Sequence, residues 1–326
     1  MYDIVSLGEL LIDFTPNGTN DLGAKLYAQN PGGAPANVLA MASRLNRKTA
    51  FLGKVGQDQF GNFLADVLNQ HDINTDGLVF DESVNTTLAF VFLDDKGDRS
   101  FSFYRRPGAD MMLRPDEVNQ NIIQQCKIFH FGAVSLTEAP ANTATLEAAA
   151  FARKAGKLVS FDPNYRPPLW NYDEARAAAG MREAAKLAHI MKVSEEELLL
   201  LTGENDVEKG AELLSAMGPS VILVTLGPKG AFFRTPAASG ILPTYDVKVV
   251  DTTGAGDAFV GSTLASLCSY PTIEELEALP KAKWEEIMML ANAAGSLATT
   301  RKGAIAIMPT MEELQTCMQN VPLLVL

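Results

Sequence analysis

Short apolar runs and longer amphipathic stretches alternate along almost the whole chain. Six runs are nearly continuous in apolar residues, which is typical of strands covered on both faces. They are residues 4–7, 49–55, 127–132, 157–162, 189–193 and 220–226. The stretches between them are candidate helices, at residues 34–44, 59–70, 115–124, 141–154, 172–187 and 207–217. This alternation predicts a doubly wound, mainly parallel α/β sheet with helices on both faces.

Two segments interrupt the alternation. Residues 10–15 and 25–29 flank a turn-rich patch, and residues 86–93 and 100–104 flank a second turn at 94–98. Both patterns predict β-hairpins. We expect these strands, inserted at about residues 10–30 and 86–105, to form a small antiparallel sheet that serves as a lid. An edge extension of the main sheet is the alternative. With no compositional break, residues 1–326 are expected to form a single domain.

Composition and charge narrow the functional classes. The chain has 326 residues, 47% of them hydrophobic, and a formal net charge of −12. An acidic protein of this kind is a poor partner for nucleic acid or an anionic membrane. The three cysteines and three histidines are scattered and show no metal-ligand spacing, and few cysteines in so long a chain fit a reducing compartment. Neither a signal peptide nor a membrane span is apparent, so we expect a cytoplasmic protein that acts on small molecules.

Residues 251–257, Asp-Thr-Thr-Gly-Ala-Gly-Asp, carry the clearest chemistry. They lie between an apolar run at 245–250, predicted to be a strand, and a predicted helix at 258–265. The backbone N–H groups at a helix start lack intrahelical partners and favour an anion. Gly254 and Gly256 let the backbone bend and approach a ligand closely. A capped helix that binds nothing is the alternative.

Asp257 places a carboxylate at the same bend. A Ser or Thr would cap the helix equally well, so capping alone does not explain an acid there. An acid beside an anion site is explained if it takes a proton from a hydroxyl group while the bend holds the phosphate that the hydroxyl attacks. The segment therefore predicts phosphoryl transfer to an alcohol.

A second glycine-rich segment, residues 30–37, ends a predicted strand and opens the helix at 34–44. Gly32 and Gly33 allow close backbone approach, Asn37 offers both a donor and an acceptor, and Asp13 is a carboxylate in an apolar stretch. Together these groups suit adjacent sugar hydroxyls. Taken separately, the glycines also fit a tight turn and Asp13 a solvated strand residue. The P-loop and dinucleotide-binding fingerprints are both absent from the sequence.

The two glycine-rich segments with their helices, in this order and far apart, resemble the signatures of the ribokinase-like carbohydrate kinases, the PfkB family. The resemblance covers essentially the whole chain. It implies an α/β core with a β-sheet lid and ATP-dependent phosphorylation of a sugar hydroxyl. It implies that Asp257 is the catalytic base, and that the anion hole is formed by Gly254, Ala255 and Gly256. The implied sugar-binding positions are Asp13, Gly32, Gly33 and Asn37.

The same resemblance implies a nucleotide site and two cation sites. Thr225, Gly227 and Gly230 match a T-x-G-x-x-G nucleotide loop, and Gly256 also faces the nucleotide. Ser194 and Glu197 resemble the N-x-x-E motif, in which Glu197 organises Mg²⁺ indirectly; Ser194 departs from the usual Asn. Asn292 matches an adenine neighbour. The implied monovalent-cation positions, a candidate site for K⁺, are Asp251, Thr253, Ala298, Arg301 and Gly303. Ile307 stands where ribokinase supplies a serine oxygen, so the chain departs from the family pattern at this site.

Two further stretches concern the sugar. Residues 102–110 resemble a fructokinase motif, and residues 162–170 resemble one that fructokinases share with 2-keto-3-deoxygluconate kinases. Arg105 and Arg166 match arginines that face the substrate, although each would also fit a surface ion pair. Phe103 stands where the keto-acid kinases carry a tyrosine, which favours a neutral ketohexose.

The sequence thus predicts a kinase that converts fructose into fructose 6-phosphate. A 2-keto-3-deoxygluconate kinase or another sugar kinase of the family is the alternative, and a non-catalytic sugar- or nucleotide-binding regulator is the alternative of a different class. The resemblance also implies a homodimer formed through the lid.

Overall fold

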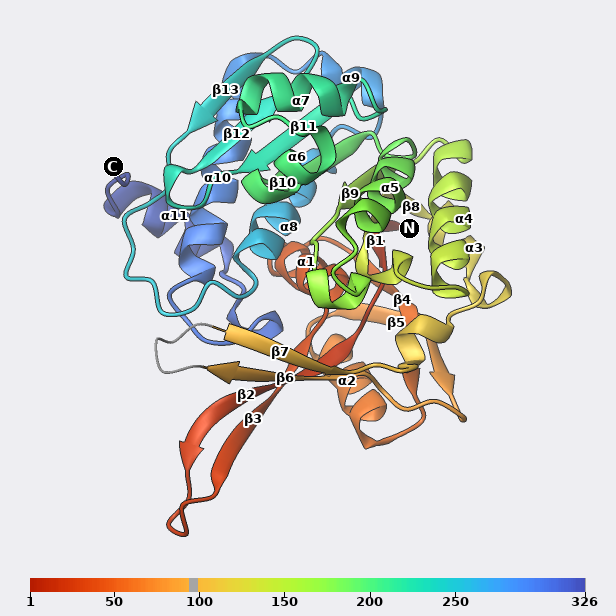
Figure 1. The fold of residues 1–326 in the computed structure, drawn as a ribbon. Helices are drawn as coiled ribbons and strands as arrows, with labels where there is room; N and C mark the ends of the chain where they lie inside the picture. Colours follow the sequence, from red (N-terminus) through yellow and green to blue (C-terminus); the bar gives the residue numbers. More distant parts are fainter. Residues whose placement is uncertain (94–98, 326) are drawn as a thin grey trace.

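The computed structural model describes residues 1–93 and 99–325 (Figure 1); the predicted turn at 94–98 lies outside them. Within the described residues, a nine-stranded sheet forms the centre of the molecule. In spatial order its strands are β13 (Ser239–Leu242), β12 (Ala231–Arg234), β11 (Val221–Thr225), β10 (Ile190–Ser194), β9 (Leu158–Asp162), β8 (Cys126–Gly132), β1 (Tyr2–Leu7), β4 (Thr49–Gly56) and β5 (Ile73–Asp81). All neighbours are parallel except the β11–β12 and β12–β13 pairs. The predicted mainly parallel sheet is confirmed.

Helices cover both faces of this sheet. They are α1 (Ala34–Arg44), α2 (Gln59–Gln70), α3 (Gln120–Gln124), α4 (Ala141–Lys154), α5 (Glu174–Ala185), α6 (Glu195–Thr202), α7 (Val207–Ser215), α8 (Ala255–Leu267), α9 (Ile273–Glu277), α10 (Lys281–Ala298) and α11 (Met311–Asn320). Short 3-10 helices are η1 (Ala109–Met112), η2 (Pro115–Glu117), η3 (Val134–Leu136), η4 (Pro167–Trp170), η5 (Gly227–Lys229) and η6 (Ile305–Ile307).

Alternate residues of each central strand belong to different hydrophobic clusters. Ile4 and Ile128 pack with α1, α8 and α10, whereas their neighbours Val5 and Phe129 pack with α4, α5 and α7. Successive side chains of a strand point to opposite faces, and here both faces are buried. This two-sided burial explains why the strands are almost continuously apolar in sequence.

A second sheet projects from this body (Figure 1). Its order is β3 (Lys25–Gly32), β2 (Leu11–Thr19), β6 (Leu88–Leu93) and β7 (Arg99–Tyr104), so both predicted hairpins are confirmed. The β2–β6 pair is parallel, which makes the lid sheet mixed rather than purely antiparallel. The reason is topological: β2 follows β1 and β6 follows β5, and both core strands are parallel to β4 between them. Both hairpins therefore leave the main sheet at the edge formed by the carboxyl ends of its parallel strands.

Three parts of the sequence prediction need correction. Residues 245–250 are not a strand, because they find no neighbouring strand beyond a single bridge at Tyr245 and because Val249 and Val250 are exposed. Residues 115–124 do not form one helix but split into η2 and α3, where the Asn119 side chain caps the second piece. The peripheral strands β5, β12 and β13 escaped prediction because they are short or interrupted by polar residues.

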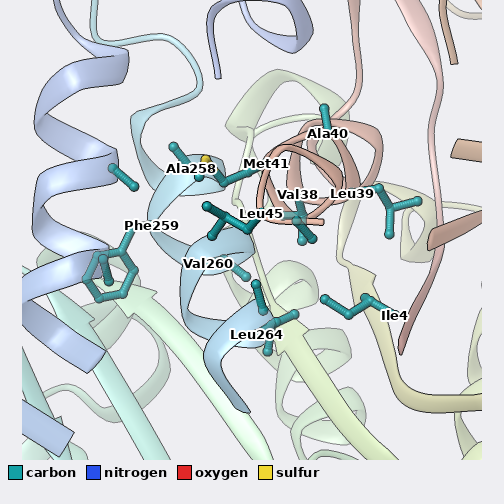
Figure 2. Packing of buried hydrophobic residues seen from close by; sticks show 14 of the residues in the cluster. Ile4, Val38, Leu39, Ala40, Met41, Leu45, Ala258, Phe259, Val260 and Leu264 are labelled. Carbon is teal, nitrogen blue, oxygen red and sulfur yellow. The ribbon is translucent and has the colours of Figure 1, made fainter. Parts of the chain in front are cut away.

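Helices α1 and α8 pack directly against each other, with Val38 and Met41 of α1 beside Val260 of α8 (Figure 2). Gly261 makes this contact close. A Cβ atom at this position would lie 2.6 Å from Met41 Cβ and 2.6 Å from the Val38 carbonyl oxygen. The absence of a side chain at Gly261 therefore sets the distance between the two helices.

A Gly261→Ala substitution tests this constraint. Alanine favours a helix by about 1 kcal/mol over glycine, but overpacking costs about 1–3 kcal/mol, and one of the two clashing atoms here is backbone that cannot rotate away. We expect a lower free energy of unfolding in chemical denaturation, together with a lower kcat/KM. The control is Ser266→Ala on the same helix, which removes only a hydrogen bond to the Ser262 carbonyl. Equal or greater stability of Gly261→Ala would contradict the packing argument.

Candidate active site

The carboxyl ends of the parallel strands gather polar side chains at one edge of the main sheet. Asp162 ends β9, Ser194 ends β10 and Thr225 ends β11, and Ser194 and Thr225 are directly paired across the sheet. In open α/β sheets, ligands bind outside this edge, where the strand order reverses. Here the order reverses between β1 and β8, and the helices α1 and α8 begin beside it.

Asp257 lies in the first turn of α8, with only 8% of its surface exposed. Its Oδ2 accepts a hydrogen bond of 2.7 Å from Nδ2 of Asn37, on α1. Burial raises the pKa of Asp257 to about 6, the Asn37 hydrogen bond acts to lower it, and the negative charge of Asp162 raises it further. The structure thus joins the two glycine-rich segments, and it gives the acid a pKa closer to neutrality than that of an ordinary aspartate, as a general base requires.

The bend before Asp257 has the geometry of an anion site. Gly254 adopts a left-handed conformation with φ of 76°, and its carbonyl accepts the first helical hydrogen bond from the Ala258 N–H. Ala255 N–H is engaged by the Thr252 carbonyl. Within the described residues, the N–H groups of Gly256 and Asp257 meet no acceptor. Two backbone donors at a helix start are therefore available to an anion.

The predicted sugar-binding residues also converge. A Cβ atom at Gly32 would lie 2.4 Å from Asp13 Oδ2, and one at Gly33, where φ is 124°, would lie 2.3 Å from the Glu9 carbonyl oxygen. Close packing against Asp13 therefore requires Gly32, and close packing against the backbone at Glu9 requires Gly33. Asn37 Oδ1 is buried and has no hydrogen-bond partner among the described residues, so an acceptor remains for a hydroxyl group. Burial raises the pKa of Asp13 to about 6, against the opposing charge of Arg166.

Phe103 and the two arginines occupy different surroundings. Phe103 is half-buried and belongs to the same cross-strand row of the lid as Ala89 and Asp13, so its side chain is on the Asp13 face. Arg166 is exposed. Its positive charge acts to lower the pKa of both Asp13 and Asp257, against the larger effect of burial, so this charge lies near both acids.

Arg105 is buried, unlike Arg166. Its Nε donates to Asp110 at 2.7 Å, Nη1 to Thr137 at 3.0 Å and Nη2 to the Val134 carbonyl at 3.2 Å. Its observed role is to tie the segment after β7 to the segment around η3. Contact with the sugar stays a prediction for this residue.

The predicted nucleotide residues fall into two groups. Ser194 and Glu197 form a capping box at the start of α6, in which Ser194 Oγ accepts from the Glu197 N–H and Glu197 Oε2 accepts from the Ser194 N–H. Glu197 Oε1 accepts from the Tyr165 N–H at 2.7 Å. Serine in place of the usual asparagine therefore still fixes the glutamate, because it caps the same helix.

The second group lies at the far side of the sheet. Thr225 ends β11, and Gly227 and Gly230 follow with φ of 57° and 95°. A Cβ atom at Gly230 would lie 2.0 Å from the Leu242 carbonyl oxygen, and Asn292 Nδ2 donates to that oxygen at 3.0 Å. The predicted nucleotide loop and Asn292 therefore contact the same peptide group.

The segments of the predicted monovalent-cation site are also adjacent. Asp251 Oδ1 accepts from the Thr253 N–H at 2.8 Å, and Asp251 N–H donates to the carbonyl of Thr299, the residue after Ala298. Gly254 packs against Ala304, which follows Gly303. Arg301 forms an ion pair with Glu313, so only its backbone is a candidate for cation binding.

The sequence analysis singles out none of three charged residues of this region, which are Lys192, Asp162 and Glu9. Lys192 on β10 is buried and pairs with Asp162 at 3.1 Å. Glu9 is buried beneath the sugar-side loop, where its Oε1 accepts from the Ala34 N–H at 2.9 Å. The sequence holds a signal for each of them, namely a charged residue inside an apolar run, at its end or shortly after it.

Comparison with known proteins identifies the family of the chain. The model of the pfkB family carbohydrate kinase matches residues 1–311, and the chain belongs to this family; it is a carbohydrate kinase. Probable fructokinase-4 of Arabidopsis thaliana is 44% identical over 320 residues, which cover 97% of each chain. Fructokinase-2 of Solanum lycopersicum is 42% identical, over 97% of this chain and 96% of that protein.

Solved structures give the same assignment. The fructokinase of Xylella fastidiosa with bound ATP superimposes with a TM-score of 0.91 at 34% identity, over 98% of this chain and 99% of that one. The fructokinase of Vibrio cholerae O395 in its fructose-, ADP- and calcium-bound form gives a TM-score of 0.86 at 35% identity, over 97% and 99%. The ribokinase-like fold predicted from the sequence is therefore confirmed.

The raised pKa values predict a pH-dependent activity. A base must be deprotonated to accept a proton, so kcat/KM should fall by at least about tenfold per pH unit well below the pKa of about 6 at Asp257, and level off above it. Asn37→Ala removes a hydrogen bond that lowers this pKa, and its acid limb should move to higher pH. The control is Asn142→Ala, whose side chain donates to the Leu136 carbonyl and should leave the profile unchanged. An acid limb in Asn37→Ala at or below the wild-type pH would contradict the coupling.

Proposed function

We propose that this protein is a fructokinase that transfers the terminal phosphoryl group of ATP to fructose and releases fructose 6-phosphate and ADP. One observation carries the proposal: the buried Asp257 carboxylate lies beside two unengaged backbone N–H groups and is held by the Asn37 amide of the sugar-side segment. A base, an anion site and a sugar-side residue thus share one location. The relatives named as fructokinases support the choice of sugar.

The reaction needs few protein groups. The oxygen of a fructose hydroxyl attacks the terminal phosphorus, the bond from that phosphorus to the bridging oxygen breaks, and its electron pair stays on ADP. The hydroxyl proton passes to Asp257 and then to solvent. The N–H groups of Gly256 and Asp257 would stabilise negative charge on the phosphoryl oxygens. They are held in place by the backbone before the reaction begins, so they need no rearrangement to do so.

Fructose is favoured over an acidic sugar by the residue at position 103. Phe103 offers no hydroxyl group on the Asp13 face of the lid, whereas Asp13 and Asn37 supply polar groups that suit neutral hydroxyls. We expect Asp13, Asn37, Arg166 and Gly33 to line the sugar site, with Arg105 supporting it. ATP would lie along residues 225–230 toward Asn292.

The groups present fit a Mg²⁺ ion carried by the nucleotide. Within the described residues, no three His, Cys, Asp or Glu side chains converge to hold a metal. Mg²⁺ at kinase sites keeps several waters and binds the substrate phosphates with one or two carboxylates. Both oxygens of Glu197 already accept backbone hydrogen bonds, so we propose that it acts through water. We propose K⁺ for the oxygen-rich turn around Asp251 and Thr253.

We also propose a homodimer formed through the lid. The face of the lid opposite Asp13 carries an aromatic group in which Phe90 contacts Phe14, Tyr27 and Tyr104, and Phe14 also contacts Phe60 of α2. Tyr104 is 65% exposed on this face, so a second lid would cover apolar surface there. Residues 1–326 would then act as one domain with its lid shared between subunits.

A cytoplasmic location is proposed as well. The structure reports three free, buried thiols, at Cys126, Cys268 and Cys317, which suit a reducing compartment. None of the helices in the described ranges is long and apolar enough to cross a membrane.

An assay of ADP release over a panel of sugars tests the function. We expect ADP to form with ATP, Mg²⁺ and fructose, with a higher kcat/KM for fructose than for 2-keto-3-deoxygluconate or ribose. A preference for the acidic sugar would contradict the interpretation of Phe103. Binding of fructose or ATP without ADP release from any sugar would show a regulator instead of a kinase.

Asp257→Asn separates catalysis from folding. Loss of a general base lowers kcat by at least about 100-fold, while fructose binding measured by calorimetry should remain. Folding raises the pKa of Asp257 from 3.8 to about 6, so the stability contributed by the protonated acid is lost as the pH rises from about 4 to about 6, and the neutral amide avoids this loss. The variant should therefore be more stable at pH 7, by up to about 3 kcal/mol, and equally stable at pH 4. A variant with near-normal kcat would rule out Asp257 as the base.

A further inference from the structure

Lys192 is a buried cation at the active site that the mechanism above leaves without a role. Its residue surface is 8% exposed, and its Nζ lies 3.1 Å from Oδ2 and 3.3 Å from Oδ1 of Asp162. An ammonium group has three N–H donors, and these contacts engage at most two of them. They are also longer than the 2.7–2.9 Å typical of charge-assisted hydrogen bonds.

Lys54 provides a comparison within the same sheet. It is also a buried strand lysine, but its Nζ lies 2.9 Å from Asp81, 2.9 and 3.0 Å from the two oxygens of Glu117, and 3.1 Å from the Met112 carbonyl. A lysine whose role is structural is thus surrounded by protein acceptors. Among residues 1–93 and 99–325, Lys192 has one carboxylate partner, so its ammonium group retains capacity for another acceptor.

The position of Lys192 shows where that acceptor would lie. A Cβ atom at Gly256 would be 3.1 Å from Lys192 Nζ, so the ammonium group lies against the turn that carries the unengaged N–H groups of Gly256 and Asp257. Burial alone lowers the pKa of Lys192, but the negative charges of Asp162, Glu197 and Asp257 together raise it above its ordinary value. The side chain is thus a fixed positive charge beside the anion site.

We infer that Lys192 is a catalytic residue whose ammonium group donates a hydrogen bond to the phosphoryl group during its transfer, together with the N–H groups of Gly256 and Asp257. This inference rests on the proposed kinase function. Lys192 moves no proton: the hydroxyl proton still goes to Asp257, and the electron pair of the broken bond stays on ADP. Asp162 holds the ammonium group in place through two of its N–H groups. Gly256 then has a second purpose, because a side chain there would displace the ammonium group.

Nucleotide binding gives the first test. Lys192→Met removes the charge at similar length, and Lys54→Met is the matched control for the loss of a buried ion pair. Affinities of the full-length protein for ADP and for AMP-PNP, a non-hydrolysable ATP analogue, are measured by calorimetry with Mg²⁺. A hydrogen bond between charged groups predicts that Lys192→Met loses about tenfold of the preference for AMP-PNP over ADP, while Lys54→Met keeps the wild-type preference. An unchanged preference in Lys192→Met would overturn the inference.

Turnover gives the second test and controls for folding. Lys192→Met should lower kcat with fructose by at least about 100-fold, as expected for loss of a charge-stabilising donor. Because the single variant leaves Asp162 buried and unpaired, Lys192→Met/Asp162→Asn is compared with Asp162→Asn alone. The inference is overturned if these two variants have the same kcat and the same preference for AMP-PNP. Absence of turnover in the wild-type protein with every sugar would instead overturn the proposed function.

Discussion

The hydrogen bond between Asn37 and Asp257 is the interaction on which the site depends. It connects the first turns of α1 and α8, which lie at opposite ends of the sequence, and it is possible only because those helices pack closely along their length. Gly261 provides this close packing, since a larger residue would press on Met41 and on the backbone at Val38. A packing constraint in the core therefore determines where Asp257, the proposed base, lies relative to Asn37.

The second constraint is electrostatic. Asp13, Asp162, Glu197 and Asp257 gather acidic groups at the carboxyl edge of the sheet of a protein that already carries a net charge of −12. Burial raises the pKa of both Asp257 and Asp13, and the negative charge of Asp162 raises that of Asp257 further. A polyphosphate can approach such a site only if positive charge or backbone donors compensate, and the structure provides both near Gly256. The acid and the anion site are thus compatible within one turn.

Much of this architecture is present in the sequence because local patterns and long-range packing agree. The ranges of α1, α2 and α4 follow directly from their sequence patterns, and both glycine-rich segments are visible in the sequence without knowledge of their contact. The prediction of a strand at residues 245–250 is wrong because alternating apolar residues are a strand pattern, whereas a strand also needs a neighbouring strand. Within the described residues, the fold supplies only a single bridge at Tyr245. Lys192 was overlooked because its partner Asp162 is on another strand, and only the parallel register of β9 and β10 joins them. Contacts that require tertiary packing, such as the one at Gly261, are not visible in a local pattern.

The predicted sugar-binding residues are divided between the lid sheet and the central body, and this division has a kinetic consequence. Asp13 is on the projecting sheet, while Asn37 is on a helix of the central layer. A hexose bound by both residues would hold the lid sheet against the central body. Without a hexose, no ligand would join the two parts. A water molecule is too small to contact both residues, so it would rarely close the lid over bound ATP. Hydrolysis of ATP would therefore stay slow until the sugar binds.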